Sequence, residues 1–330
     1  MYKPLRMTIR GTGHALPQRV VTNQELARTL DTSHEWIVSR SGIRERRIIA
    51  GGECTASMAV EASRKAMEAA SVAKDEIDMI ICGTITPDLR LPATACLVQR
   101  ELDMGHVPAF DINVACCGFL YGMFIAAHFV DKGTYNNVLV VASDAMTSMA
   151  DPDDRATYVL FGDGAGAAVI GRQQEPGQEL IYSALYADGQ GAKLIWVPGG
   201  GAVMPVSQTV LDERLHFVKM KGREVYKFAV TEMQNAIAEG FEKTSLTVDD
   251  VAMVIPHQSN LRIIESAREK LGIPTEKMYV NIDRVGNTSA ASVPICLDEL
   301  IRAGRLKRGD VVLSVAFGAG LTWATSVFRL

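Results

Sequence analysis

The chain has 330 residues, of which 48% are hydrophobic, 22% charged and 6% aromatic, and this balance excludes a disordered chain. Single hydrophobic cores stop growing near this length, which excludes one small domain and favours two domains or a duplicated core. The 34 lysines and arginines against 38 acidic residues give a net charge of -4. Most nucleic-acid-binding proteins need a positive field, so no nucleic-acid partner is expected.

In chain order, short β-branched runs alternate with helical patterns, which predicts an α/β fold. Four uncharged runs are typical of strands buried on both faces; they cover residues 79–82, 138–142, 251–255 and 311–316. Five segments have helical periodicity, several of them with a glycine stop signal; they cover residues 55–70, 117–131, 222–241, 259–271 and 289–303.

The two halves of the chain follow a similar plan. Residues 76–88 correspond to residues 249–260, because each segment has an acidic entry, a buried strand and a polar loop. Residues 136–146 correspond to residues 309–320 in the same way. Charge, proline and glycine collect in residues 171–177, which indicates a boundary. We therefore expect a duplicated fold; its halves are residues 1–173 and residues 174–330.

Residues 112–130 form a run of 19 uncharged residues, a length that a transmembrane helix can have. Residues 110–114 are typical of a buried strand, and the run contains Asn113 and His128. We favour a strand followed by a helix buried on all sides. The start of the chain has no apolar signal-peptide segment, and the six cysteines are scattered rather than densely spaced. A cytoplasmic protein without membrane insertion is expected.

The motifs of common cofactor and metal sites are incomplete or missing. Gly162, Gly164 and Ala167 have the spacing of a dinucleotide fingerprint, but a strand-like run follows where that fingerprint needs a helix. We favour a glycine-rich bend between strands. Residues 199–201 lack the lysine of a P-loop, no G-x-S-x-G occurs, and no cysteine or histidine spacing suits a metal.

Cys116 lies where the predicted strand 110–114 turns into a helix. Backbone N–H groups at a helix start carry partial positive charge, which stabilises a thiolate, the nucleophilic form of cysteine. A buried cysteine is more often a small hydrophobic residue, and this alternative describes Cys117 and Cys82 well. By position alone, nucleophile and core residue are equally good interpretations of Cys116.

Two polar residues are candidates to act with Cys116. His257 follows the predicted strand 251–255, where α/β sheets bind ligands, although a lone histidine is more often structural. Asn287 lies in a turn before a helix, where asparagine is more often a cap. A thiolate, an imidazole and an amide donor suit acyl transfer. Papain-like proteases use the same residue types, but the sequence VACCGFLYG lacks their cysteine signature, so we exclude a protease.

Motifs along essentially the whole chain resemble those of β-ketoacyl-acyl-carrier-protein synthase III, the initiating condensing enzyme of bacterial fatty-acid synthesis. In order they are GTGHALP, EWIVSRSGIRERR, FDINVACCGF, FGDGAGAAVIG, PHQSNLRI, GNTSAAS and FGAGLTWATSVFRL. Their shared order is far more specific than any single motif. The resemblance implies the thiolase fold, in which duplicated halves form a layered αβαβα sandwich.

The resemblance also implies the roles of the three candidates. Cys116 is expected to take an acyl group from acyl-CoA; malonyl-acyl-carrier protein then loses CO2, and the carbanion attacks the acyl-cysteine. The backbone N–H groups of Cys116 and Ala319 are expected to hold the thioester oxygen, and His257 and Asn287 the enolate oxygen. The family needs no cofactor and is expected to act as a homodimer.

Six positions correspond to the family's contacts with CoA or the carrier protein; they are Trp36, Arg40, Arg155, Lys227, Asn260 and Arg262. A tryptophan with nearby arginines suits an adenine ring and phosphates. The basic residues could also dock an acidic carrier protein. The alternative is a solvated charged turn, formed by Arg40, Arg44, Arg46 and Arg47.

The sequence departs from the family pattern at three positions. Ala319 replaces a glycine of the FGAG turn, which keeps the N–H group but restricts the backbone. Leu91 replaces a phenylalanine that often lines the acyl pocket from the partner subunit, so the starter acyl group stays open. Cys117 replaces a small apolar residue beside the nucleophile, and we have no mechanistic reason for it.

Three other functions are alternatives to this one. A degradative thiolase would need a second cysteine in residues 317–320, which contain none, so condensation is favoured over thiolysis. A related acyltransferase or condensing enzyme of secondary metabolism, with a different starter or acceptor, stays open. A non-catalytic protein that binds CoA or acyl chains also stays open, because a fold does not fix an activity.

Overall fold

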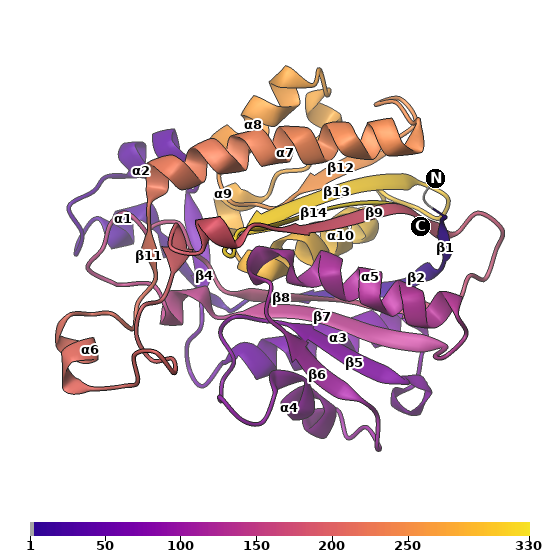
Figure 1. Ribbon diagram of the computed structural model, residues 1–330, viewed down its shortest axis with the longest axis horizontal. Coiled ribbons are helices and arrows are strands. Elements are labelled where there is room, and N and C mark those ends of the chain that lie inside the picture. Colours follow the sequence, from indigo (N-terminus) through magenta and orange to yellow (C-terminus); the bar gives the residue numbers. More distant parts are fainter. Residues whose placement is uncertain (1–2) are drawn as a thin grey trace.

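The computed structural model describes residues 3–330. Two five-stranded sheets are stacked on each other, with helices between them and on both outer sides (Figure 1). The first sheet has the spatial order β2 (Thr8–Ala15), β8 (Gly164–Gly171), β7 (Asn137–Asp144), β5 (Met79–Gly83) and β6 (Ala109–Ile112). In it, β5 is parallel to β6 and β7, whereas β8 is antiparallel to β2 and β7.

The second sheet repeats this arrangement. Its order is β1 (Leu5–Arg6), β9 (Glu179–Ala187), β14 (Thr322–Arg329), β13 (Val311–Gly318) and β12 (Met253–Pro256). Only β12 and β13 are parallel; the other pairs are antiparallel. Strands β9, β14, β13 and β12 thus have the order and directions of β2, β8, β7 and β5, which confirms the predicted duplication.

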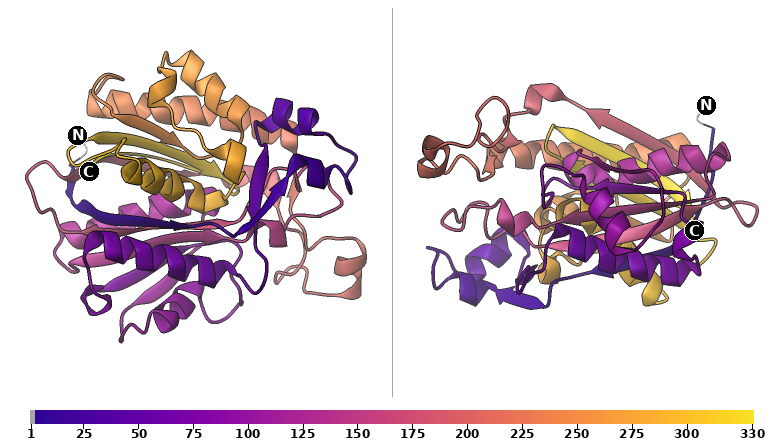
Figure 2. Two further views of the ribbon diagram at one scale, coloured as in Figure 1. Left: turned by 180° about the vertical axis from the view of Figure 1, so that it is seen from behind. Right: turned by 90° about the horizontal axis from the view of Figure 1, so that it is seen from below.

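The helices form three layers around the two sheets. Helices α5 (Gly118–Asp131) and α10 (Ser292–Arg302) lie between the sheets, and each contacts strands of both. Helices α3 (Thr55–Ala70) and α4 (Thr94–Glu101) cover the outer side of the first sheet (Figure 2). On the opposite side lie α7 (Gly222–Thr244) and α8 (Leu261–Lys270). The layers are therefore αβαβα, as expected from the resemblance.

A continuous apolar cluster in the central layer joins the two halves. It includes Ile81 and Met123 from the first half with Ile255, Leu297 and Val312 from the second. The uncharged run 112–130 is the end of a strand followed by α5, which packs between the sheets as predicted. Among residues 3–330, no helix is both long and apolar enough to span a bilayer.

The ends of several predicted elements shift in the structure. The predicted helix 55–70 coincides with α3, whereas the predicted helix 289–303 begins with a 3-10 turn, Ser289–Ala291, before α10. The strand-like run predicted after the glycine-rich bend is confirmed. It is part of strand β8, which begins at Gly164 and pairs with β2 and β7 on its two sides, so the bend ends before Gly164.

The predicted division after residue 173 falls between β8 and β9, and it stays a prediction. The short strand β1 precedes β2 in sequence but pairs with β9, so N-terminal residues complete the second sheet. Smaller elements gather at one end of the sandwich (Figure 1). They are β3 (Arg19–Thr22), α1 (Asn23–Leu26), α2 (His34–Ser41), β4 (Glu45–Ile48), β10 (Ile195–Trp196), α6 (Gln208–Asp212), β11 (Lys219–Met220) and α9 (Ile282–Val285).

Candidate active site

A cavity of about 570 Å³ opens where β6, β12 and β13 end. Cys116, His257 and Asn287 all line it, although 171 residues separate the first of them from the last (287 − 116). Ala319 lines it as well. The structure therefore brings together the three predicted side chains and the predicted turn. Much of the remaining wall is apolar; it includes Ile85, Met146, Met149, Phe161, Ile195 and Trp196.

Cys116 is presented by a tight turn between β6 and α5. The turn is a 3-10 helix, Ala115–Cys117, and Ala115 takes a left-handed backbone conformation with φ of 48°. Such a conformation is strained for a non-glycine residue and is often found at functional sites. Gly318, at the end of β13, lets this strand approach the Cys116 turn closely. A Cβ atom at Gly318 would lie only 2.8 Å from the Cys116 nitrogen.

Cys116 is half-buried on the wall of the cavity. Burial raises the pKa of the Cys116 thiol to about 12, and the nearby Ser289 hydroxyl acts in the opposite direction. The partial positive charge of the helix start also favours the charged form. The stabilised thiolate that the position of Cys116 predicts stays a prediction. Cys117 is fully buried and outside the cavity wall; its sulfur lies 3.6 Å from Thr322 Oγ1.

His257 directly follows β12 and is almost completely buried. Its backbone N–H donates to the carbonyl of Val315 at 2.7 Å, which ties it to β13. Its Nδ1 atom lies 2.7 Å from Ser292 Oγ, and its ring meets Phe317 edge to face at 5.5 Å. Burial lowers the pKa of His257 to about 3, so the imidazole is neutral at neutral pH.

Asn287 is positioned by the glycine-rich segment 161–171. Its N–H donates to the carbonyl of Leu160 at 2.9 Å, and its carbonyl accepts from Gly162 N–H at 3.1 Å. A Cβ atom on Gly162 would lie 2.1 Å from the carbonyl oxygen of Val285, so only glycine fits there. The side-chain Oδ1 accepts from Ser289 N–H at 2.9 Å, which leaves the Asn287 amide N–H groups to donate.

Two backbone N–H groups complete the donor set of the cavity. The N–H groups of Cys116 and Ala319 have no carbonyl acceptor within the part of the chain that the structure describes. Both residues line the cavity, and Gly318 lets their segments approach each other. This pair can therefore donate hydrogen bonds to an oxyanion that forms beside the Cys116 sulfur.

Most of the predicted CoA-contacting residues form a connected cationic rim. The guanidinium groups of Arg40 and Arg155 lie 5.2 Å and 5.4 Å from the centre of the Trp36 ring. Asn260 Nδ2 donates to the Arg40 carbonyl at 3.0 Å, and Asn260 also lines the cavity. Arg262 follows in the first turn of α8. The rim thus connects the surface at Trp36 with the cavity.

Lys227 and Leu91 stand apart from these contacts. Lys227 is exposed on α7, next to Tyr226, over whose ring the Arg262 guanidinium lies at 5.4 Å. Leu91 is 87% exposed and does not line the cavity within this single chain. The solvated-turn interpretation fails for Arg46, which is buried and donates to the carbonyls of Val21 and Val159.

The sequence analysis missed two buried polar residues that support the site. Ser292 contacts His257, as described above. Asp144 accepts hydrogen bonds from Thr84, Thr86 and the N–H group of Ile85, and its second oxygen lies 3.4 Å from the Ala290 nitrogen. It thus links the end of β7 to the turn before α10. The motif GNTSAAS contained Ser292, but no sequence signal distinguished it from its neighbours. The described residues contain no group of three metal-ligating side chains.

Comparison with known proteins identifies the family of the chain. Residues 110–189 match the profile of 3-oxoacyl-[acyl-carrier-protein] synthase III, and residues 241–330 match its C-terminal profile. A β-ketoacyl-[acyl-carrier-protein] synthase III of Caldanaerobacter subterraneus is 49% identical over 329 residues, covering 100% of this chain and 99% of that protein. One from Symbiobacterium thermophilum is 46% identical, covering 97% of each.

Comparison of the fold with solved structures points to the same family as the sequence comparisons. The crystal structure of 3-oxoacyl-[acyl-carrier-protein] synthase III from Aquifex aeolicus superposes with a TM-score of 0.91 at 43% identity, covering 98% of this chain and 100% of that one. Together with the convergence of Cys116, His257 and Asn287 on one cavity, these similarities show that the chain belongs to the β-ketoacyl-[acyl-carrier-protein] synthase III family.

Proposed function

We propose that the protein is an acyltransferase that condenses an acyl-CoA with malonyl-acyl-carrier protein, releasing CoA and CO2 and forming a β-ketoacyl-carrier protein. The observation that carries this proposal is the meeting of one cysteine, one neutral histidine and one asparagine in a single cavity. The cavity connects to a cationic rim through Asn260. Membership of the family supports the same reaction.

The first half-reaction moves the acyl group to Cys116. The sulfur attacks the thioester carbonyl, and the negative charge develops on the carbonyl oxygen, near the N–H groups of Cys116 and Ala319. The C–S bond to CoA then breaks, and the proton of the Cys116 thiol ends on the sulfur of CoA. Since burial raises the pKa of this thiol, the proton passes to the departing CoA sulfur as the C–S bond to CoA breaks.

The second half-reaction forms the carbon–carbon bond. The malonyl thioester loses CO2, and the electron pair of the broken bond moves onto the thioester oxygen as an enolate. His257 and Asn287 are neutral donors beside this oxygen, and donors that are already in place stabilise such charge without reorganising. The enolate carbon then attacks the acyl group on Cys116, and the thiolate that leaves takes up a proton to restore the thiol.

The rim residues are assigned to the two large substrates. Trp36 with Arg40 and Arg155 suits the adenine and phosphates of CoA, because guanidinium groups pair with phosphates and lie over aromatic rings. Asn260 and Arg262 at the start of α8, together with Lys227 on α7, are assigned to the docking of an acidic carrier protein. We further propose a cytoplasmic homodimer that needs no cofactor, with Leu91 lining the acyl pocket of the partner.

A panel of acyl-CoA substrates with malonyl-acyl-carrier protein as acceptor tests this function. One or more short straight or branched acyl-CoA should give β-ketoacyl-carrier protein with equal amounts of CoA and CO2, and should name the starter. Acylation of Cys116 without any product on the carrier protein would exclude the condensation. Product on another acceptor would place the protein with the related enzymes of secondary metabolism.

A further inference from the structure

A neutral imidazole carries one N–H proton, and its function depends on which ring nitrogen holds it. At His257 the two nitrogens have different surroundings. Nδ1 faces Ser292 Oγ at 2.7 Å. Nε2 has no hydrogen-bond partner among the described residues, and the side chain lines the cavity. Only the tautomer with the proton on Nε2 can donate to a substrate oxygen in the cavity.

The surroundings of Ser292 decide between the tautomers. Its hydroxyl oxygen accepts from the backbone N–H of Gln258 at 3.2 Å. His257 Nδ1 is the single acceptor within reach of the hydroxyl proton among residues 3–330. If Nδ1 carried a proton, both groups would donate to the serine oxygen and the buried hydroxyl proton would have no acceptor, which costs free energy. The hydroxyl therefore donates to Nδ1, and Nδ1 is unprotonated.

We propose that Ser292 is a positioning residue that fixes His257 in the tautomer with its proton on Nε2, so that His257 is a hydrogen-bond donor to the substrate. This inference rests on the proposed function for its catalytic consequence. A histidine held in this way cannot take the proton of Cys116, because Nε2 is already protonated. It can serve the decarboxylation, in which an enolate oxygen needs a donor.

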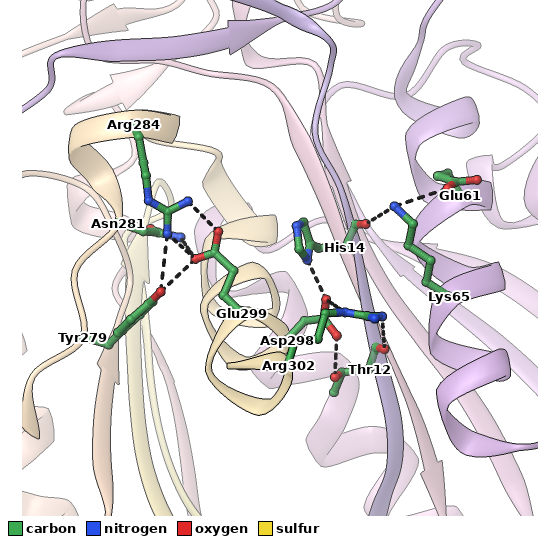
Figure 3. A network of polar contacts seen from close by, with 10 residues as sticks. All are labelled: Thr12, His14, Glu61, Lys65, Tyr279, Asn281, Arg284, Asp298, Glu299 and Arg302. Atoms are coloured by element: carbon green, nitrogen blue, oxygen red, sulfur yellow. Dashed lines mark hydrogen bonds and ion pairs between the residues drawn. The ribbon is translucent and has the colours of Figure 1, made fainter. Parts of the chain in front are cut away.

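The position of Ser292 is fixed by the helix that it begins. Near the other end of α10, the adjacent carboxylates of Asp298 and Glu299 point in different directions and bind different parts of the fold (Figure 3). Asp298 accepts from Thr12 Oγ1 at 2.7 Å and contacts His14, both on β2. Glu299 accepts from Arg284 and from Asn281, which precede Asn287. These contacts hold α10 against both halves and so support the placement of the serine hydroxyl next to the imidazole.

Nitrogen-15 spectra of protein labelled in histidine test the tautomer directly. A difference spectrum against His257→Gln assigns the two signals of His257. At neutral pH we expect an unprotonated Nδ1 and a protonated Nε2, and in Ser292→Ala a mixture of both tautomers. A protonated Nδ1 in the unchanged protein would overturn the proposal, and so would an unaltered tautomer in Ser292→Ala. The first result needs no variant of Ser292 to fold.

Kinetics of the two half-reactions test the consequence. Ser292→Ala should slow decarboxylation of malonyl-carrier protein by about tenfold or more, while acylation of Cys116 changes less than about twofold. Ser292→Thr keeps the hydroxyl and should recover most of the rate. Ser183→Ala is the matched control, because it removes a buried serine hydroxyl that bonds Ser326 and does not line the cavity. Equal loss of both half-reactions in Ser292→Ala would contradict the positioning role.

The two tests separate the failure of this inference from failure of the proposed function. If the unchanged protein acylates Cys116 and decarboxylates malonyl-carrier protein but has the proton on Nδ1, the function stands and the role of Ser292 is wrong. If it has the expected tautomer but turns over no thioester, the role of Ser292 in the tautomer stands and the function is wrong.

Discussion

The same turn occurs once in each half of the molecule, and the two copies carry different side chains. Ala115–Cys117 precedes α5 and Ser289–Ala291 precedes α10; each is a 3-10 helix whose first residue has a left-handed backbone, with φ of 48° and 53°. Cys116 in the first turn corresponds to Ala290 in the second. The two halves thus share one backbone geometry at this turn, and the side chains on the two turns differ.

In the proposed function, the first turn carries the nucleophile, whereas the second turn supports the hydrogen-bond donors. Ser289 N–H holds the Asn287 side chain, and Ser292 at the start of α10 contacts His257. Asp144 connects the end of β7 to the second turn, because one of its oxygens lies 3.4 Å from the Ala290 nitrogen. A change in the first turn should therefore stop acyl transfer, and a change in the second turn should stop mainly decarboxylation.

The largest expected effect tests the first turn. Cys116→Ser should lower acylation by labelled acyl-CoA by at least about 10³-fold, because a hydroxyl without a base is a poor nucleophile. Cys117→Ser is the matched control; its side chain is outside the cavity wall, so mass spectrometry should still find the label on Cys116. Label on Cys117 in the unchanged protein would reverse the assignment of the two cysteines.

The second prediction separates the two regions. His257→Ala should lower decarboxylation of malonyl-carrier protein by about 10²-fold, since one donor to the enolate is lost. Acylation of Cys116 should fall by less than about threefold, measured as burst release of CoA. A parallel loss of both steps would show that the histidine also acts on the cysteine, contrary to the division between the turns.

The third prediction concerns the support of Asn287. Gly162→Ala places a Cβ atom 2.1 Å from the Val285 carbonyl oxygen. The backbone segments at Gly162 and Val285 must therefore move apart. We expect the free energy of unfolding to fall by about 1–3 kcal/mol and decarboxylation to fall more than acylation. Gly105→Ala is the control, because nothing lies within 4 Å of its added Cβ. Unchanged stability in Gly162→Ala would contradict the close approach.

The smallest expected effect is a pH dependence of stability. Burial lowers the pKa of folded His257 from 6.5 to about 3, so between these values the unfolded chain binds a proton that the folded chain does not. The stabilising contribution is fully present above pH 6.5 and decreases as the pH falls, by up to about 1.4 kcal/mol per pH unit.

Denaturant unfolding at several pH values measures this slope. His257→Gln removes the titrating group and should show a weaker loss of stability between pH 6.5 and 3 than the unchanged protein. His106→Gln, at an exposed position, should keep the original slope. Identical slopes for all three proteins would mean that the His257 imidazole is not held neutral in the folded protein.

Local sequence patterns predicted the elements well where burial alone determines structure. Uninterrupted apolar runs such as 138–142 became central strands, because both faces of each sheet are covered by helices. The strand-like run predicted after the glycine-rich bend became strand β8, which begins as early as Gly164 because its pairing with β2 and β7 includes the glycines. The solvated turn also does not describe Arg46, because its buried carbonyl partners lie on segments that are distant in sequence.

The sequence by itself determined the α/β class, the duplication and the three residues of the candidate site, because periodicity, internal similarity and motif order are local properties of the chain. Only the tertiary structure decided the protonation states of that site. A pKa depends on how far water is excluded, and a tautomer depends on a partner such as Ser292, which lies 35 residues from His257 in sequence and 2.7 Å away in space.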